Sequence, residues 1–221
     1  GDDPLLVRRR RKALARLIGR DVVWMDQTHS TRVEIVTRVE GAPRLAGASS
    51  SLEAPAPGEW GPVRADGIVI DARGWAGAPG LAVQTADCLP VVLAADGGRV
   101  VAAVHAGRRG LLGGILTRAV DAIRELADGQ INALIGPAIC GSCYEVPAQM
   151  VRDSEAVMPG IGAVTSWGTP SLDLPRAAAA LLADAGVHVE IDPRCTLEDG
   201  GLFSYRADPE CGRQALIIVP A

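Results

Sequence analysis

The sequence predicts an α/β chain with mixed β-sheets, and two patterns carry that prediction. Short apolar runs bounded by turn residues recur along the chain, and such runs are typical of buried strands. In other stretches apolar residues repeat at helical spacing, as Ile115, Ala119 and Ile123 do. Because strand-like and helix-like stretches alternate as far as the C-terminus, we expect a single domain over residues 1–221.

The first predicted element is a helix over residues 4–18. Asp2 and Asp3 supply an N-cap, and Pro4 suits the first turn because its fixed φ matches the helix. Gly19 then provides the stop signal at the other end.

The remaining elements follow from the same signals. The predicted strands are short apolar runs at residues 22–25, 33–36, 67–71, 81–84, 90–94, 100–104, 133–135, 187–191 and 216–219. The predicted helices cover residues 115–126, 148–157 and 174–185. Residues 41–62 are rich in Gly, Ala, Ser and Pro, which predicts an exposed, mobile loop.

Charge and aromatic content argue against a nucleic-acid-binding protein. The formal net charge is -4 and 3% of the residues are aromatic, whereas nucleic-acid binding needs a basic field and usually aromatic faces for stacking. The run from Arg8 to Arg11 lies in a chain whose only lysine is Lys12, so the arginines reflect a compositional bias.

The sequence also lacks membrane and secretion signals. It contains no run of about 18 to 20 apolar residues and no signal-peptide pattern. Five cysteines, an odd number, fit a reducing compartment better than a disulfide framework. We therefore expect a cytoplasmic protein without a membrane partner, monomeric or weakly homo-oligomeric. Because the chain opens at Gly1 without Met, we expect a further N-terminal segment in the full protein.

Three side chains that can bind a metal lie at the ends of predicted strands. His29 and Cys88 each come a few residues after a strand, and His105 directly ends one. Imidazole nitrogen and thiolate sulfur are preferred zinc donors, at about 2.0 to 2.3 Å. Three protein ligands would leave a fourth position for a water whose pKa falls toward about 7. Asp87, next to Cys88, is a candidate to orient a ligand imidazole.

Spacing alone leaves open the alternative that these residues are simply packed and hydrogen-bonded, because they lie far apart in the sequence. His188, inside a predicted strand, should face solvent. The pair Cys140 and Cys143 forms a CxxC, but Cys195 and Cys211 are sixteen residues apart and supply no second pair. A structural or incidental role is therefore favoured over a four-cysteine site.

The glycine-bearing stretch of residues 107–114 allows two interpretations. Its small residues and arginines suit an anion site at the start of the following helix. The same residues also suit a tight turn that caps the helix. The stretch matches neither a Walker loop nor a dinucleotide fingerprint.

Several segments, read together, resemble one known family. These are Gln27-Thr28-His29, Ala65-Asp66-Gly67, Thr85-Ala86-Asp87-Cys88-Leu89-Pro90, residues 104–110, residues 135–139 and Tyr144-Glu145-Val146. They resemble the laccase-domain family, also called multicopper polyphenol oxidase or peptidoglycan editing factor. The likeness covers nearly the whole chain in order.

The resemblance implies an α/β (α+β) fold in which two mixed β-sheets pack face to face with helices on the outside. It implies zinc held by His29, Cys88 and His105. It further implies a purine nucleoside phosphorylase that cleaves adenosine, inosine and methylthioadenosine with phosphate, and that deaminates adenosine.

Three alternatives accompany this prediction. Copper-dependent polyphenol oxidation normally needs several coppers bound through many histidines, and the chain has three histidines. An editing hydrolase acting on peptidoglycan precursors follows from another of the family's names. A purely structural zinc in a binding module would need a fourth protein ligand.

Phosphorolysis assigns roles to further residues. Phosphate attacks C1′ of the ribose as the purine leaves, so electrostatic stabilisation should dominate. Arg109 is predicted to hold phosphate through its guanidinium fork. Asp87 and Glu145 are predicted to handle protons or orient groups, and Gln27 and Arg108 to contact the substrate.

The chain also departs from the family pattern near these residues. Arg108 stands where the family usually has Trp, Ala207 where a second Arg is usual, and Cys211 where Thr is common. An N-terminal segment with an Arg-x-Gly-Gly motif is missing. These departures bear on the choice of substrate and leave the three predicted metal ligands intact.

Overall fold

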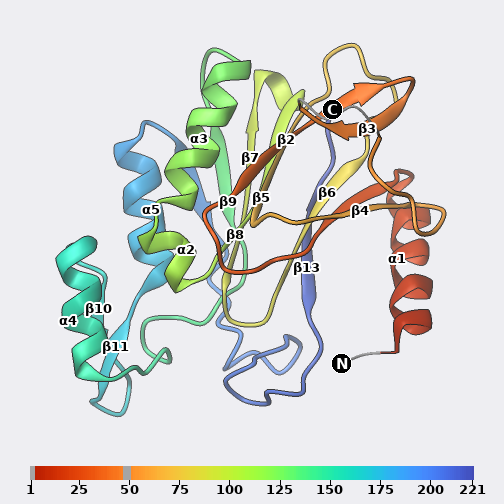
Figure 1. The fold of residues 1–221 in the computed structure, drawn as a ribbon. Helices are drawn as coiled ribbons and strands as arrows, with labels where there is room; N and C mark the ends of the chain where they lie inside the picture. The colour runs from red at the N-terminus through yellow and green to blue at the C-terminus, as the bar shows by residue number, and fades with distance from the viewer. Residues whose placement is uncertain (1–2, 47–50) are drawn as a thin grey trace.

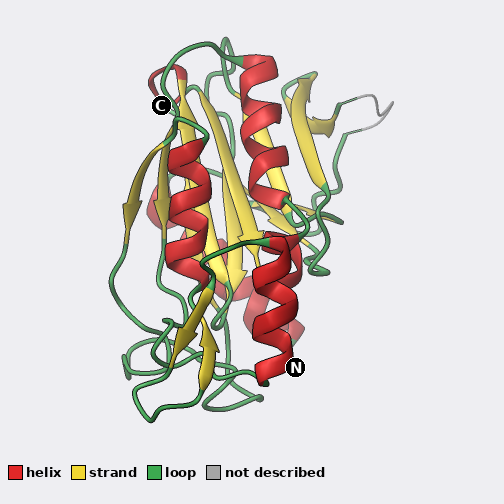
Figure 2. Ribbon diagram, turned by 90° about the vertical axis from the view of Figure 1, so that its left-hand side faces the viewer, coloured by secondary structure: helices red, strands yellow, loops and turns green. Residues whose placement is uncertain are grey.

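Two mixed β-sheets pack face to face in the computed structural model, and helices cover their outer faces (Figures 1 and 2). The structure describes residues 3–46 and 51–221. This arrangement confirms the predicted fold class. None of the helices in that part of the chain is both long enough and apolar enough to cross a membrane.

The larger sheet has seven strands in the order β12-β9-β7-β8-β5-β2-β3. Its central strands are antiparallel, whereas β2 runs parallel to β5 and β12 parallel to β9. The bounds in chain order are β2 (Val33–Val39), β3 (Ala42–Leu45), β5 (Gly67–Asp71), β7 (Leu89–Ala95), β8 (Val100–Ala106), β9 (Asn132–Ile135) and β12 (His188–Ile191).

The smaller sheet has four strands in the order β13-β6-β1-β4. Strand β1 runs parallel to both neighbours, and β13 is antiparallel to β6. The strands are β1 (Val22–Met25), β4 (Glu59–Val63), β6 (Gly80–Thr85) and β13 (Gln214–Ile218). A separate hairpin is formed by β10 (Gly162–Val164) and β11 (Pro170–Leu172).

Five α-helices and one 3-10 turn complete the described chain, and their ends follow the predicted signals. The elements are α1 (Pro4–Ile18), α2 (Arg108–Leu112), α3 (Ile115–Leu126), α4 (Ala148–Val157), α5 (Leu174–Asp184) and η1 (Asp96–Gly98). The Asp3 carboxylate accepts a hydrogen bond from the Leu5 N–H, and Gly19 ends α1 with φ 68°. Asp2, the other predicted cap, lies outside the described residues.

The apolar residues of the described chain form three layers of core and one small cluster at Ile139, Cys143 and Cys195. Helices α3 and α5 pack on the outer face of the seven-stranded sheet, α1 packs on the outer face of the four-stranded sheet, and a third cluster fills the space between the sheets. The side chains of β5 point alternately to the two faces of the sheet and so contribute to two of these layers. Its Ile68 and Ile70 belong to the cluster between the sheets, whereas Val69 belongs to the cluster under α3.

The prediction for residues 41–62 was wrong in part. Strand β3 and most of β4 lie in this stretch, and both join sheet edges. Alternating burial in β4 leaves Glu59 and Gly61 inside, a pattern that the composition of a Gly-rich, Pro-rich segment conceals. The middle of the stretch, residues 47–50, lies outside the described residues.

The sequence also left some elements unassigned. Helix α2 and strands β10 and β11 were not predicted, because each has five residues or fewer and carries little periodicity. Strand β12 was predicted, and its first residue, His188, is exposed as expected.

Candidate metal centre and pocket

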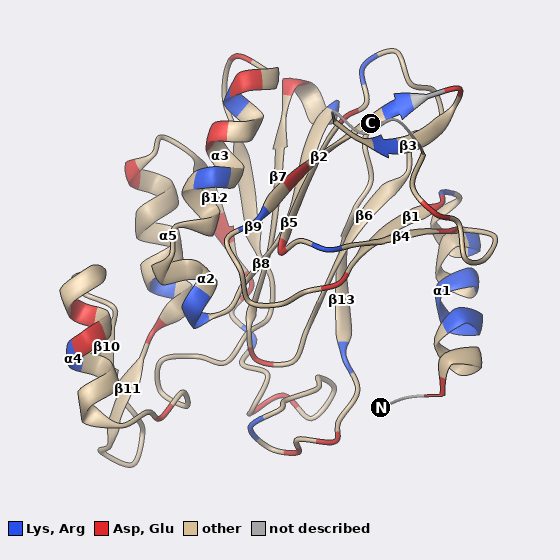
Figure 3. Ribbon diagram, in the orientation of Figure 1, with Lys and Arg blue, Asp and Glu red and all other residues tan. Residues whose placement is uncertain are grey.

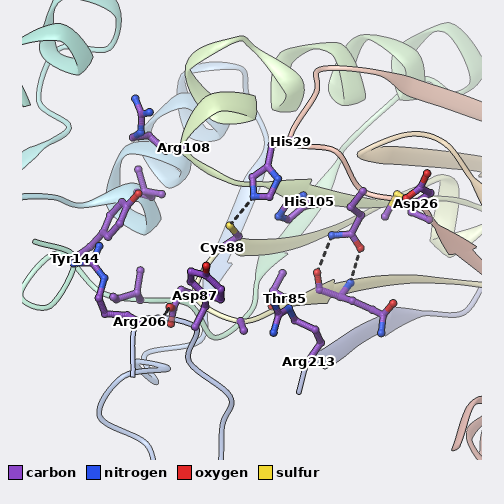
Figure 4. Close-up of a pocket in the computed structure, with 17 residues that line it drawn as sticks. Asp26, His29, Thr85, Asp87, Cys88, His105, Arg108, Tyr144, Arg206 and Arg213 are labelled. Atoms are coloured by element: carbon purple, nitrogen blue, oxygen red, sulfur yellow. Dashed lines mark hydrogen bonds between the residues drawn. The ribbon is translucent and has the colours of Figure 1, made fainter. Parts of the chain in front are cut away.

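His29, Cys88 and His105 converge on one point (Figure 4). Their ligand atoms all lie within 4.8 Å of one another. The Cys88 Sγ is 3.6 Å from the Nε2 of His29, and the two imidazole rings lie edge to face with centroids 4.7 Å apart. Two nitrogens and one sulfur at this separation are a donor set that suits a single transition metal ion.

The strand pairing explains the meeting of Cys88 and His105. Strands β7 and β8 are antiparallel neighbours, and Pro90 of β7 pairs with His105 of β8. Cys88 immediately precedes β7, so both side chains come to the same end of the seven-stranded sheet. His29 arrives from the connection between β1 of the small sheet and β2 of the large one. The site therefore lies where the two sheets meet.

A fully buried carboxylate, Asp66, organises the site. Its oxygens accept hydrogen bonds from the backbone N–H groups of Thr28, His29 and Ser30, at 3.2, 3.0 and 2.7 Å. The Nδ1 of His105 lies 2.8 Å from the same carboxylate. His29 itself has φ 58°, a left-handed conformation that the three backbone hydrogen bonds stabilise.

The charges in this cluster support one another. Burial alone would raise the pKa of Asp66, but hydrogen bonds from His105 and Ser30 hold it well below its usual range. Burial alone would lower the pKa of His105, but Asp66 and Cys88 raise it to about 9. Burial alone would raise the pKa of Cys88, but the two histidines lower it to about 7. The sulfur is therefore readily available as a thiolate.

Close packing requires a glycine beside the ligands. A Cβ on Gly107 would lie 2.7 Å from Cδ2 of His29 and 3.1 Å from Sγ of Cys88. Both distances are shorter than ordinary contacts, so any side chain at this position would push ligands out of place.

A pocket of about 710 Å³ opens over the three ligands, all of which line it. Arg108 at the start of α2 and Tyr144 lie on one side in Figure 4, and Arg206 and Arg213 come from the C-terminal segment. The Arg206 guanidinium lies 5.4 Å from the centre of the Tyr144 ring. The wall thus combines cationic groups with an aromatic face.

The predicted site residues do not all reach this pocket. Gln27 and Arg108 line it, but the Gln27 amide already exchanges two hydrogen bonds with the backbone of Gln84, at 2.8 and 2.9 Å. Arg109 is exposed and is not among the lining residues. Glu145 also lies outside the lining, and its carboxylate accepts a hydrogen bond from the indole of Trp167 at 2.6 Å.

Asp87 lines the pocket but does not bond to a ligand imidazole. Its two oxygens accept hydrogen bonds from the Thr196 hydroxyl at 2.6 Å and the Arg206 N–H at 2.7 Å. The imidazole partner in the structure is Asp66. The expected orienting role of Asp87 is therefore corrected: its carboxylate turns toward the C-terminal segment and ties that segment to the site.

Sequence reasoning assigned no role to Asp66, Tyr144, Arg206 or Arg213, although Asp66 and Tyr144 lie within the segments that carried the family resemblance. Asp66 directly precedes β5, and its side chain reaches three backbone N–H groups nearly forty residues earlier. No periodicity in the sequence reports such a contact.

Comparisons with known proteins found relatives and solved structures that match most of the chain. A protein of Streptomyces griseus named purine nucleoside phosphorylase is 42% identical over 97% of this chain and 82% of its own length. A protein of the same name from Mycobacterium tuberculosis is 40% identical over 99% of this chain and 81% of its own. The structure of a Neisseria meningitidis protein aligns with TM-score 0.77 and 34% identity, covering 100% of this chain and 84% of that one.

A second solved structure, YlmD from Geobacillus stearothermophilus, aligns with TM-score 0.77 and 30% identity, covering 100% of this chain and 82% of the other. The family described as multi-copper polyphenol oxidoreductase laccase matches residues 1–221. With the match spanning every residue and relatives at 40% and 42% identity, this chain belongs to that laccase-like family.

Proposed function

We propose that this protein is a zinc-dependent purine nucleoside phosphorylase that also deaminates adenosine. The observation that carries the proposal is the convergence of His29, Cys88 and His105 beneath a pocket lined by arginines and Tyr144. The names of the similar Streptomyces and Mycobacterium proteins support the nucleoside class. Adenosine, inosine and methylthioadenosine are the proposed substrates.

The residues present fit a zinc ion with one open position. The cluster contains two histidines and one cysteine, and within the described residues no fourth His, Cys, Asp or Glu joins it. Structural zinc sites normally have four protein ligands, whereas catalytic sites have three. A zinc ion held there would supply Lewis-acid chemistry at the floor of the pocket.

The arginines of the wall are the proposed binding groups for phosphate. Arg108, Arg206 and Arg213 line the pocket, and a guanidinium fork matches two phosphate oxygens at once. In phosphorolysis a phosphate oxygen forms a bond to C1′ while the bond from C1′ to the purine nitrogen breaks. We assign the phosphate role first predicted for Arg109 to these three residues, because Arg109 lies outside the pocket lining.

Tyr144 is the proposed contact for the purine. Its ring lies on the pocket wall, half-buried, with the Arg206 guanidinium over one part of it. Aromatic rings bind bases by stacking, at about 1 to 3 kcal/mol per base. Tyr144 would thus take the part of the tryptophan that the family usually carries at the position of Arg108.

A product assay tests the proposal. The purified protein is incubated with adenosine or inosine, with and without inorganic phosphate, and products are separated by chromatography. We expect free base and ribose 1-phosphate only when phosphate is present, and inosine from adenosine in either condition. Absence of both products in every condition, from protein that is folded and metal-loaded, would contradict the proposal.

Copper-dependent phenol oxidation is less well supported by the site. Two of the chain's three histidines are in the cluster, and the third, His188, lies exposed at the start of β12. Several coppers need many imidazoles. We further propose a cytoplasmic setting, and the phosphorylase names of the similar proteins support small-molecule substrates.

A further inference from the structure

A second group of potential metal ligands lies beside the pocket. Cys140, Cys143, Cys195 and Glu198 bring their ligand atoms within 4.8 Å of one another, and none of the thiols is in a disulfide. The sequence did not predict this meeting, because Cys195 lies 55 residues beyond Cys140 and its spacing to Cys211 forms no second CxxC.

The four residues sit on two turns of the same kind. In the first, the Cys143 N–H donates to the Cys140 carbonyl at 3.0 Å; in the second, the Glu198 N–H donates to the Cys195 carbonyl at 3.2 Å. Each turn therefore offers donors at positions i and i+3. This spacing is the one that zinc knuckles use, with Glu198 in place of a fourth cysteine.

Backbone contacts hold the two turns against each other. Ala138 and Cys195 form an isolated parallel bridge, in which the Thr196 N–H donates to the Ala138 carbonyl at 3.1 Å. The Cys140 N–H donates to the Sγ of Cys195 at 3.4 Å. Hydrogen bonds from neighbouring groups to the ligand atoms are a usual feature of metal sites, and this one fixes the position of the Cys195 sulfur.

Burial suits a bound ion with an entry route. Cys143 and Cys195 are buried, whereas Cys140 is half-buried and lines a small pocket of about 240 Å³. Glu198 is exposed and would close the site from the solvent side. In a tetrahedral site with bonds of about 2.3 Å the sulfurs lie about 3.8 Å apart, which is compatible with the observed cluster.

We propose that Cys140, Cys143, Cys195 and Glu198 bind a structural zinc ion, distinct from the one at His29, Cys88 and His105. Three thiolates and one carboxylate complete a four-coordinate shell, as is usual in structural sites. A disulfide is a poorer explanation of the cluster, because it would join two of the thiols and leave the third thiol and Glu198 without a role.

The proposed ion would fasten one wall of the pocket. Ile139 and Tyr144, which flank the first turn, both line the pocket. Thr196, in the second turn, donates its hydroxyl to Asp87. Joining the turns would therefore fix the position of the Tyr144 ring relative to the segment that follows Thr196.

Metal analysis in separate variants tests the proposal independently of the catalytic assignment. The protein is purified with a non-thiol reductant and no chelator, and zinc per chain is measured by mass spectrometry. In Cys88→Ser, which removes the thiolate of the first site, we expect one zinc to remain. In Cys88→Ser/Cys143→Ser we expect that zinc to be lost, whereas Cys88→Ser/Cys211→Ser, the matched control, should keep it.

Cobalt substitution reports the number of thiolates. In the Cys88→Ser background, cobalt should give the intense sulfur-to-cobalt absorption of a three-thiolate site, and Cys211→Ser should leave that absorption unchanged. If Cys143→Ser does not fold, Glu198→Gln serves instead, with an expected loss of affinity of about tenfold or more in competition with a chelator.

Two results would overturn the proposal. One is folded Cys88→Ser, verified by near-UV circular dichroism, that binds neither zinc nor cobalt and has freely reactive thiols at Cys140, Cys143 and Cys195. The other is a disulfide among these three residues in the reduced preparation. Its mass signature would be about 2 Da below that of the reduced chain, because a disulfide forms with the loss of two hydrogens.

Discussion

At the scale of single residues, the candidate metal centre depends on groups that are not among its three potential ligands. Asp66 joins the two halves of the cluster, because one carboxylate bonds both to the loop that carries His29 and to the ring of His105. Gly107 makes room for two ligands at once. Hydrogen-bond partners of this kind fix the orientation and tautomer of a ligand ring. Their loss should therefore lower the affinity of the site for a metal.

We expect Asp66→Asn to weaken zinc binding roughly 10- to 100-fold, since an amide supplies one acceptor where the carboxylate supplies two. The measurement is zinc affinity by competition with a chromophoric chelator. Asp26→Asn is the matched control, because Asp26 also lines the pocket but is exposed. Equal affinities in the two variants would contradict the role given to Asp66.

A single methyl group at Gly107 should have a similar effect for a steric reason. We expect Gly107→Ala to retain its fold but to lose most of the zinc bound at His29, Cys88 and His105, because the new Cβ would lie 2.7 Å from the His29 ring. Gly200, where a Cβ would meet nothing within 4 Å, provides the control substitution Gly200→Ala. Full zinc content in Gly107→Ala would show that the ligands can shift without penalty.

At the scale of elements, Arg11 adds polar contacts to the apolar packing of α1 on the small sheet. The basic residues of α1 stand out in Figure 3. Among them, Arg11 forms an ion pair with Glu59 of β4, lies 4.1 Å from the centre of the Trp24 ring and donates to the Gln84 side chain at 3.2 Å. The side chains of the pair are only 18% and 7% exposed, so water cannot replace either partner easily.

Breaking this pair should cost more than breaking one on the surface. We expect Glu59→Gln to lower the free energy of unfolding by about 1 to 3 kcal/mol, because Arg11 keeps its charge without its partner. Glu34→Gln removes the partner of Arg32, whose side chain is 59% exposed. In this variant the free energy of unfolding should fall by less than about 1 kcal/mol. Urea denaturation of both variants provides the comparison, and equal losses would refute the burial argument.

At the scale of the whole molecule, the layers share their strands. Strand β8 contributes Val101 and Ala103 to the cluster between the sheets, and Val100, Ala102 and Val104 to the cluster under α3. Neither cluster can persist without a strand that also supports the other. The candidate metal centre, which lies where the sheets meet, depends on both.

We therefore expect the chain to unfold as one unit. Tryptophan fluorescence and far-UV circular dichroism should give coincident urea transitions in metal-free protein. Ile68→Ala, in the layer between the sheets, should move both transitions together, with a loss of about 2 to 5 kcal/mol. Separate midpoints for the two signals would instead indicate two independently folding parts.

Local signals were sufficient for most elements. The N-cap, proline and glycine that bound α1, and the helical spacing of α3, predicted those helices at their observed positions. The buried strands β5, β6, β7 and β8 were predicted from short apolar runs, to within one or two residues at each end. These features depend on neighbours in the sequence, which is why the sequence reveals them.

What the sequence determined by itself was the alternation of elements, the family likeness and the residue types able to hold a metal. Only the tertiary structure decided that Asp66 rather than Asp87 supports the imidazole, that Arg108 rather than Arg109 faces the pocket, and that Cys195 joins the CxxC turn. The reason is physical: side chains distant along the chain meet through strand pairing and turn geometry, and those contacts leave no periodic trace in the order of residues.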